Sequence, residues 1–338
     1  MRIALLRALQ LGDMLCAVPA FRALSAEYPA ARITLVGLPW ARELAARFRR
    51  YLYDFAEFPG FPGLPERPAD TAAIPEFFRR TKAMGFDLAV QMHGSGEITN
   101  PLTVLMGARH TAGFYRPGQY CPDAERYVEW RDDEHEVLRY LRLMERLGVP
   151  SCGSGLEFPL HEADLREAAG FGLARGRYAI VHAGSQLPSR RWPAERFAEV
   201  ADALAEDGLQ VVLTGTANEA DITRAVGKCM RSPALDLAGR TTLGGLAALV
   251  ARARLVLAND TGISHIAAAL QAPSVIVASG SDPRRWAPLD RRLHRVLWHP
   301  TECRPCGHAE CPIGHPCALG VSAAQVTHEA LSLAACAA

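Results

Sequence analysis

The stretch LVLANDTGISHIAAAL (residues 255–270) decides the fold, because two apolar runs enclose four residues that favour turns and helix caps. The first run, residues 255–258, has the length of a buried strand. The second run, from Ile263 to Leu270, repeats apolar residues at helical spacing. Residues 259–262 are therefore predicted to form a strand-to-helix turn, where the free N–H groups at the start of the helix suit an anion.

The same order of strand, loop and helix recurs along both halves of the chain. Strands are expected at residues 3–6, 32–36, 88–92, 178–182, 210–214, 254–258 and 274–278. Alternation with helices predicts the α/β class, with parallel sheets covered on both faces. The Gly-containing residues 148–176 separate the halves, so we predict two domains, residues 1–160 and 161–338, the second closed by a helix at 323–335.

Length and charge narrow the class of protein. A chain of 338 residues suggests two domains of about 150 residues each. A net charge of +1 gives no case for a nucleic-acid partner. No apolar run approaches the roughly 20 residues that span a bilayer, and the apolar run after Met1 is short for a signal peptide. We expect a cytoplasmic protein without a transmembrane segment. The sequence leaves open whether it acts at the inner face of a membrane.

Residues 260–265 allow two interpretations. Asp260, Thr261 and Gly262 fit a helix cap worth about 1 kcal/mol. They also fit a diphosphate site on the amides of Thr261, Gly262 and Ile263. His265 is expected on the helix face opposite the apolar residues, where it could donate to a phosphate oxygen.

A second candidate site follows the strand expected at 178–182. In HAGSQLPSRRWPAERF (residues 182–197), small residues that include Ser185 are followed by Arg190 and Arg191. A solvated charged loop is one interpretation of this stretch. Phosphate binding is the other, because a guanidinium offers paired donors and parallel strands end at one edge of a sheet.

The first loop of the chain contains a candidate base. In LGDMLCAVPAFRAL (residues 11–24), Asp13 follows a glycine, in a loop expected to precede the helix, and Pro19 is expected to mark a kink. Asp13 is either a helix N-cap or a carboxylate that a helix N-terminus keeps ionised. An ionised carboxylate that faces a substrate hydroxyl is a general base.

Standard cofactor motifs are absent from the sequence. It has no P-loop, and HGSGEIT (residues 93–99) has Thr99 where a dinucleotide site needs a third glycine. Four cysteines cluster near the C-terminus on a loop rich in Pro and Gly. They are Cys303, Cys306, Cys311 and Cys317. Structural zinc, disulfides and free thiols all fit this irregular spacing, and we assign no catalytic role to the loop.

Four blocks together resemble glycosyltransferase family 9, the ADP-heptose:lipopolysaccharide heptosyltransferases and their relatives. They occur in family order and are LLRALQLGDMLCAVPAFRAL, HAGSQLPSRRWPAERFAEVADAL, LAGRTTLGGLAALVARARLVLANDTGISHIAAAL and CRPCGHAECPIGHPC. The resemblance implies a GT-B architecture, with two Rossmann-like doubly wound domains facing across a cleft. The N-terminal domain would bind the acceptor and the C-terminal domain the nucleotide-sugar.

The resemblance also implies an inverting transfer that needs no metal or other cofactor. Asp13 matches the family's proposed base, and Thr261, Gly262 and His265 match its diphosphate turn. Arg190 stands where the family usually has Lys, and Glu219 is expected to contact the nucleoside.

The resemblance implies an ADP-sugar as the donor, and ADP-heptose is the first candidate. The implied acceptor is a lipopolysaccharide core sugar, another glycan or a small molecule. Two alternatives remain at this point: a nucleotide-sugar epimerase on the same fold, and a nucleotide-sugar-binding protein without catalysis.

Overall fold

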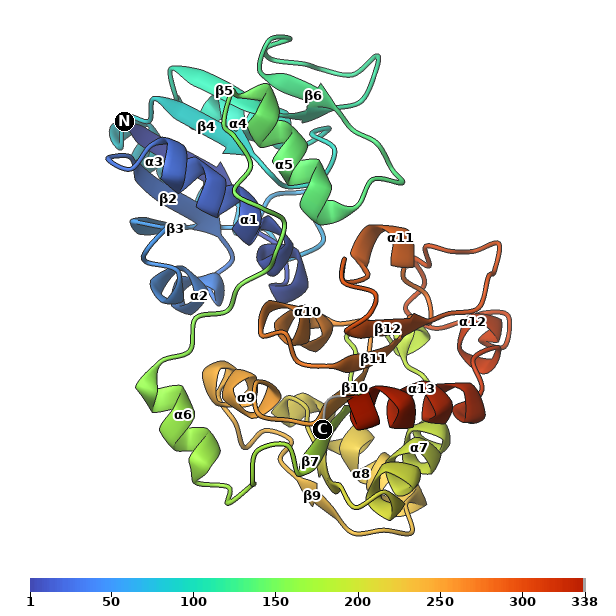
Figure 1. Cartoon of the computed structure of the whole chain (residues 1–338). Coiled ribbons are helices and arrows are strands. Elements are labelled where there is room, and N and C mark those ends of the chain that lie inside the picture. The colour runs from blue at the N-terminus through green and yellow to red at the C-terminus, as the bar shows by residue number, and fades with distance from the viewer. Residues whose placement is uncertain (337–338) are drawn as a thin grey trace. The chain divides into compact units, whose positions relative to one another are not determined.

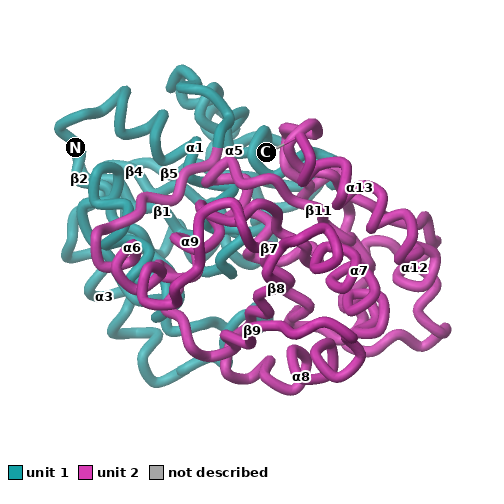
Figure 2. The backbone as a smooth tube through the Cα atoms, turned by 60° about the horizontal axis from the view of Figure 1, so that its bottom comes forward, with its two compact units in different colours: residues 1–155 teal, residues 156–338 magenta. Residues whose placement is uncertain are grey.

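Two parallel sheets of six strands each carry the fold in the computed structural model, which describes residues 1–336. The chain divides into unit 1, Met1–Gly155, and unit 2, Leu156–Ala338, coloured separately in Figure 2. The boundary lies within the predicted connection at 148–176, slightly before the predicted division at residue 160.

Unit 1 has the strand order β3-β2-β1-β4-β5-β6, with every pair parallel. Its strands are β1 (Arg2–Leu6), β2 (Arg32–Gly37), β3 (Asp54–Glu57), β4 (Leu88–Gln91), β5 (His110–Tyr115) and β6 (Tyr127–Glu129). Its helices are α1 (Leu11–Glu27), α2 (Ala41–Arg47), α3 (Ile74–Ala83), α4 (Thr99–Leu105) and α5 (Glu136–Arg146). Helix α5 packs along α1, as Figure 1 shows.

Unit 2 repeats this order as β12-β11-β10-β7-β8-β9, again all parallel. Its strands are β7 (Tyr178–His182), β8 (Gln210–Leu213), β9 (Ala234–Asp236), β10 (Leu255–Asn259), β11 (Ser274–Val277) and β12 (His294–Leu297). Its helices are α6 (Glu162–Ala169), α7 (Ala194–Glu206), α8 (Ala220–Cys229), α9 (Leu243–Val250), α10 (Gly262–Ala269), α11 (Pro283–Trp286), α12 (Pro316–Leu319) and α13 (Ala323–Cys336). Short 3-10 helices lie at Pro188–Arg190 and Ala217–Glu219.

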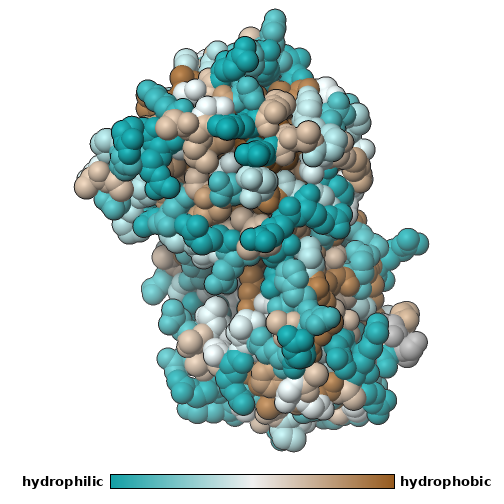
Figure 3. Space-filling model, turned by 90° about the vertical axis from the view of Figure 1, so that its left-hand side faces the viewer, coloured by the Kyte–Doolittle hydropathy of each residue, from teal (hydrophilic) through white to brown (hydrophobic). Residues whose placement is uncertain are grey.

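Strands β7 and β10 are buried along their whole length because both faces of the sheet are covered. All five residues of β10 are buried, as are all five of β7. In unit 2 one core joins Phe197 of α7, Leu257 of β10 and Val326 of α13. On the face shown in Figure 3, polar residues cover most of the surface and apolar residues appear as scattered areas.

Strand order fixes where ligands bind in each unit. The order 3-2-1-4-5-6 reverses direction between its first and fourth strands, and ligands bind outside the carboxyl ends of strands at such a switch point. The reversal lies between β1 and β4 in unit 1, and between β7 and β10 in unit 2. The segments that follow these four strands, loops and the first turns of helices, contain the predicted base, both predicted phosphate-binding stretches and His93.

Candidate active site

Asp13 lies in the first turn of α1, just beyond the carboxyl end of β1. The predicted loop through Asp13 is wrong, because α1 already begins at Leu11 and continues to Glu27 with Pro19 inside it. Asp13 Oδ2 accepts a hydrogen bond of 3.3 Å from the N–H of Gln10, the N-cap residue. Asp13 therefore completes a capping box, and its carboxylate is only partly exposed.

Arg7 connects the first turn of α1 to the sheet by hydrogen bonds. Its guanidinium is fully buried, and Nε donates to the Asp13 carbonyl oxygen at 3.0 Å. Nη1 donates to the Met92 carbonyl oxygen, beyond the end of β4, at 2.5 Å. Arg7 thus joins the two loops of the switch point through two main-chain oxygens.

The surroundings raise the pKa of Asp13 above its ordinary value. Loss of hydration is the largest cause, and the negative charge of Glu136 adds to it. Arg7, the Gln10 N–H and His93 act in the opposite direction and do not cancel the rise. The N–H at the helix N-terminus favours the ionised carboxylate, as expected, but loss of hydration outweighs it. A raised pKa makes the ionised form a stronger base.

His93 is a residue of this site that the sequence did not reveal. It follows β4, and its Nδ1 lies 3.4 Å from the Ala8 N–H nitrogen. Its Nε2 lies 3.3 Å from Glu66 Oε1, which ties the loop after β3 to the switch point. Burial alone would raise the pKa of Glu66, but the hydrogen bond and charge of His93 outweigh burial and lower it. The sequence feature that could have indicated His93 as a site residue is the HGSG stretch, which directly follows a predicted strand.

In unit 2, Asn259 joins the two predicted phosphate-binding loops. It is fully buried at the end of β10. Its Nδ2 donates to the Ala183 carbonyl oxygen at 2.8 Å, and its Oδ1 accepts from the Trp192 N–H at 2.9 Å. The loop after β7 and the turn before α10 are therefore held side by side, which fits their predicted location at one sheet edge.

Several polar atoms at this edge are buried and have no hydrogen-bond partner within residues 1–336. They are Thr261 Oγ1, Arg190 Nε, Ser279 Oγ and Ser281 Oγ. Thr261 is the N-cap of α10, and the two serines follow β11. Buried polar groups are normally paired, so these atoms suit an added polar ligand. The two serines were not identified from sequence.

Two of the residues predicted to bind the nucleotide-sugar make hydrogen bonds within the protein. A third is more deeply buried than expected. Ser185 is buried, and its carbonyl oxygen accepts from Arg191 Nε at 2.8 Å. Asp260 Oδ1 accepts from Ser264 Oγ at 3.4 Å. His265 was expected on the helix face opposite the apolar residues. It is 5% exposed, because α10 is buried nearly all round, and its ring centroid lies 6.5 Å from that of Trp286.

Glu219 closes its own turn at the end of the 3-10 helix Ala217–Glu219. Its Oε2 accepts from the Thr216 N–H at 2.8 Å and from Thr216 Oγ1 at 2.9 Å. Its Oε1 lies so close to Gly184 that a Cβ there would meet it at 2.3 Å. Burial lowers the pKa of the neighbouring His182, against the charge of Glu219. Glu219 therefore faces the loop after β7, with part of its acceptor capacity already used.

The sequence of the four clustered cysteines allows zinc, disulfides and free thiols, and their side chains are not gathered around one point in the described residues. Residues 1–336 contain no group of three or more His, Cys, Asp or Glu side chains that could hold a metal ion, and all nine cysteines are free. The loop 303–317 instead supports the phosphate-binding loops by main-chain contacts. Ser189 N donates to the Ala309 carbonyl oxygen at 3.0 Å, and Arg190 Nη2 donates to the Cys306 carbonyl oxygen at 3.3 Å.

Comparison with known proteins decides the family. The model of glycosyltransferase family 9 (heptosyltransferase) matches residues 74–316. The chain belongs to glycosyltransferase family 9. It is 26% identical over 317 residues to lipopolysaccharide heptosyltransferase 2 of Escherichia coli K12, covering 88% of each chain.

Solved structures show that this family 9 glycosyltransferase has the predicted GT-B fold. A family 9 glycosyltransferase from Veillonella parvula superposes with a TM-score of 0.81 at 24% identity, over 99% of this chain and 97% of that one. The E. coli ADP-heptose lipopolysaccharide heptosyltransferase II superposes with a TM-score of 0.77 at 22% identity, over 99% of both chains. Within residues 1–336, no helix of the enzyme is long and apolar enough to cross a membrane.

Proposed function

We propose that this enzyme transfers heptose from ADP-heptose to a hydroxyl of a lipopolysaccharide core sugar. Family membership supports a glycosyl transfer, and the names of its relatives supply the donor and the class of acceptor. Unit 2 would bind the nucleotide-sugar and unit 1 the acceptor. The reaction would take place in the cytoplasm, at the inner face of the membrane where a lipid-linked acceptor is presented.

One observation carries the donor assignment: unpaired buried polar atoms lie on the three segments that follow β7, β10 and β11 at one edge of the sheet. Thr261 Oγ1 and Arg190 Nε lack partners within the part of the chain that is described, and the first N–H groups of α10 point out of the helix end. A diphosphate would satisfy hydroxyl, guanidinium and main-chain donors together, and the helix dipole favours its negative charge.

The transfer itself is a displacement at the anomeric carbon with inversion. The acceptor oxygen forms a bond to that carbon as the bond from the carbon to the diphosphate oxygen breaks, and ADP leaves with the electron pair. Asp13 takes the acceptor proton, for which its raised pKa suits it. The donors at Thr261 and Arg190 stabilise the charge that develops on the departing diphosphate. No cofactor takes part in this proposal.

A transfer assay with ADP-heptose and a heptose-deficient lipopolysaccharide core tests the proposal. We expect transfer by the wild type and loss of at least about 100-fold in rate for Asp13→Asn, with ADP binding retained. Thr261→Val should weaken ADP binding measured by calorimetry, because it removes a hydroxyl and keeps the shape of the side chain. Asp13→Asn with a near-normal rate would exclude the base assignment.

The same assay separates the alternatives. Conversion of the nucleotide-sugar to an isomer without acceptor would identify an epimerase. Tight binding without turnover on any acceptor would identify a binding protein. Selective binding of UDP or GDP over ADP would contradict the heptose donor and leave the family unchanged.

A further inference from the structure

Four side chains near Asp13 form one buried cluster. None of them has a role in the transfer step described above. Glu136, Arg139 and Tyr140 belong to α5, which packs along α1, and Arg7 follows β1. Their exposed fractions are 2%, 0%, 1% and 0%. A buried charge is costly unless it is paired, so the contacts within this cluster show which groups stabilise one another.

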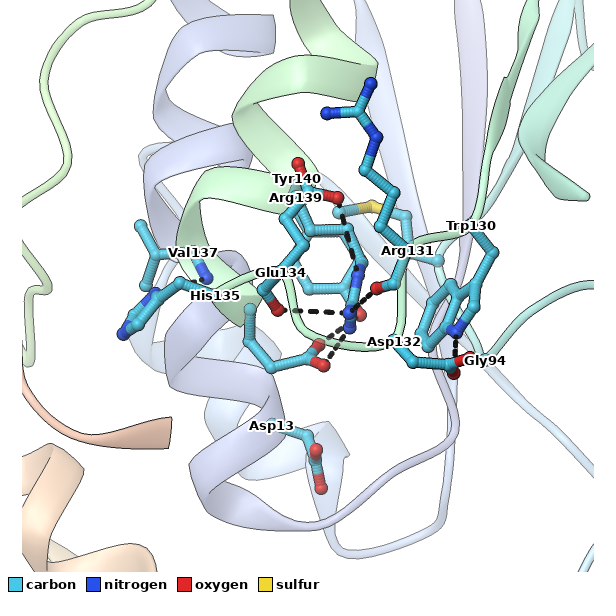
Figure 4. A network of polar contacts seen from close by, with 12 residues as sticks. Asp13, Gly94, Trp130, Arg131, Asp132, Glu134, His135, Val137, Arg139 and Tyr140 are labelled. Atoms are coloured by element: carbon cyan, nitrogen blue, oxygen red, sulfur yellow. Dashed lines mark hydrogen bonds and ion pairs between the residues drawn. The ribbon is translucent and has the colours of Figure 1, made fainter. Parts of the chain in front are cut away.

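Glu136 is the centre of these contacts. One of its oxygens, Oε1, accepts from Arg139 Nη1, and the other, Oε2, accepts from the Tyr140 hydroxyl at 3.0 Å. Arg139 is itself fixed, because Nη2 donates to the carbonyl oxygens of Arg131 at 2.5 Å and Glu134 at 3.0 Å. Figure 4 shows Arg139 held in this way beside Trp130, with Asp13 on the neighbouring helix.

The cluster reaches Asp13 through Tyr140 and Arg7. The guanidinium carbon of Arg7 lies 4.3 Å from the centroid of the Tyr140 ring. Arg7 in turn donates to the Asp13 carbonyl oxygen at 3.0 Å. The orientation of Tyr140, set by Glu136, therefore limits where Arg7 can lie, and Arg7 holds the turn that presents the Asp13 carboxylate.

We propose that Glu136 is a positioning residue for the reaction of Asp13, which orders Arg7 through Tyr140 and keeps a fixed negative charge near Asp13 when that carboxylate takes up a proton. This inference rests on the proposed role of Asp13 as base. With Asp13 ionised, Arg7 interacts with the charges of Asp13 and Glu136. Arg139 pairs with Glu136 and lies near Glu134. With Asp13 protonated, Glu136 remains as the counter-charge, so the buried cations are not left without an anion.

The charges that face Asp13 come from three parts of unit 1. Arg7 after β1 and His93 after β4 favour its ionised form, and Glu136 on α5 favours its protonated form. Loss of hydration raises the pKa of Asp13 most, and Glu136 raises it further. Removing the charge of Glu136 should therefore lower the pKa of Asp13 and make it a weaker base.

The pH profile of kcat tests this directly. The rate depends on ionised Asp13, so it falls as pH falls through the pKa of that group. Glu136→Gln should move this acid limb to lower pH by about 0.5–1 unit and lower kcat above the limb several-fold, with donor KM unchanged. Glu136→Asp keeps the charge, so its limb should remain near that of the wild type.

Glu134→Gln is the matched control. Glu134 pairs with Arg142 at 2.6 Å and lies 3.8 Å from Arg139 Nε, and it is not among the leading causes of the shift in the pKa of Asp13, as Glu136 is. Its variant should leave the limb in place. A limb that moves equally in both Gln variants would mean that loosening α5, and not the charge of Glu136, causes the shift, and this would overturn the proposal.

Glu136→Gln leaves Arg139 without its closest anion, so this variant could fail to fold. The double variant Glu136→Gln/Arg139→Gln removes both charges and still removes the anion near Asp13. It should show the same shift, with the thermal unfolding midpoint as the measure that unit 1, which contains both residues, remains folded. An unmoved limb in this variant overturns the role of Glu136.

Asp13→Asn distinguishes failure of this inference from failure of the proposed function. If Asp13→Asn is inactive and the limb does not move in the Glu136 variants, only the inference about Glu136 is wrong. If Asp13→Asn transfers heptose at a normal rate, the proposed base is wrong, and the inference falls with it.

Discussion

Replacing Asn259 with Ala removes a side chain at the end of β10 that holds the loop after β7 at two points, Ala183 and Trp192. Its amide makes two fully buried hydrogen bonds, one of 2.8 Å to the Ala183 carbonyl oxygen and one of 2.9 Å from the Trp192 N–H. The smaller alanine would leave this main-chain acceptor and this main-chain donor unpaired. Each buried group left unpaired costs about 1–3 kcal/mol. We expect the free energy of unfolding to fall by about 2–5 kcal/mol.

Urea unfolding of the purified protein, followed by tryptophan fluorescence, measures this change. Trp192 is 2% exposed, so its environment changes when unit 2 unfolds. Asn218→Ala is the control, because Asn218 is exposed and should change the free energy of unfolding by less than about 0.5 kcal/mol. A loss below about 1 kcal/mol for Asn259→Ala would refute the reasoning, since it would show that water or neighbouring groups replace both bonds.

Two further predictions follow from unit 2. Gly184→Ala places a Cβ 2.3 Å from Glu219 Oε1, so Glu219 must move and release the Thr216 N–H. Calorimetry should then show weaker ADP binding. An unchanged affinity would mean that this turn is not part of the donor site. Prolonged dialysis against a chelator should leave the thermal unfolding midpoint unchanged, because the thiols of loop 303–317 are not assembled as a metal site. A chelator-dependent drop, reversed by zinc, would contradict that arrangement.

The central strands were predictable and the edge strands were not. Residues 255–258 form a continuous apolar run and residues 178–181 a nearly continuous one, because these strands are buried on both faces. The edge strand β3, with the sequence DFAE, has no apolar run, and β9, with ALD, is only three residues long. Such strands exist because a neighbouring strand offers unpaired N–H and C=O groups, which is a tertiary cause that local sequence does not record.

The candidate site divides in the same way. The turn before α10 and the loop after β7 were recognisable because small and charged residues follow a strand directly. The pairing of Glu66 with His93 joins segments far apart in the chain, so no spacing in the sequence could indicate it. The burial of His265 depends on what packs over α10, which periodicity within the helix does not specify.

The contact between His93 and Glu66 has a consequence for engineering. Between β3 and α3 the chain runs from residue 58 to 73 without a strand or helix, and Glu66 anchors this loop to His93 after β4. A loop of this kind can be exchanged while the sheet below it keeps its register, provided that the carboxylate facing His93 is retained. If unit 1 binds the acceptor, as proposed above, grafting this segment from relatives with other acceptors is a route to new specificity.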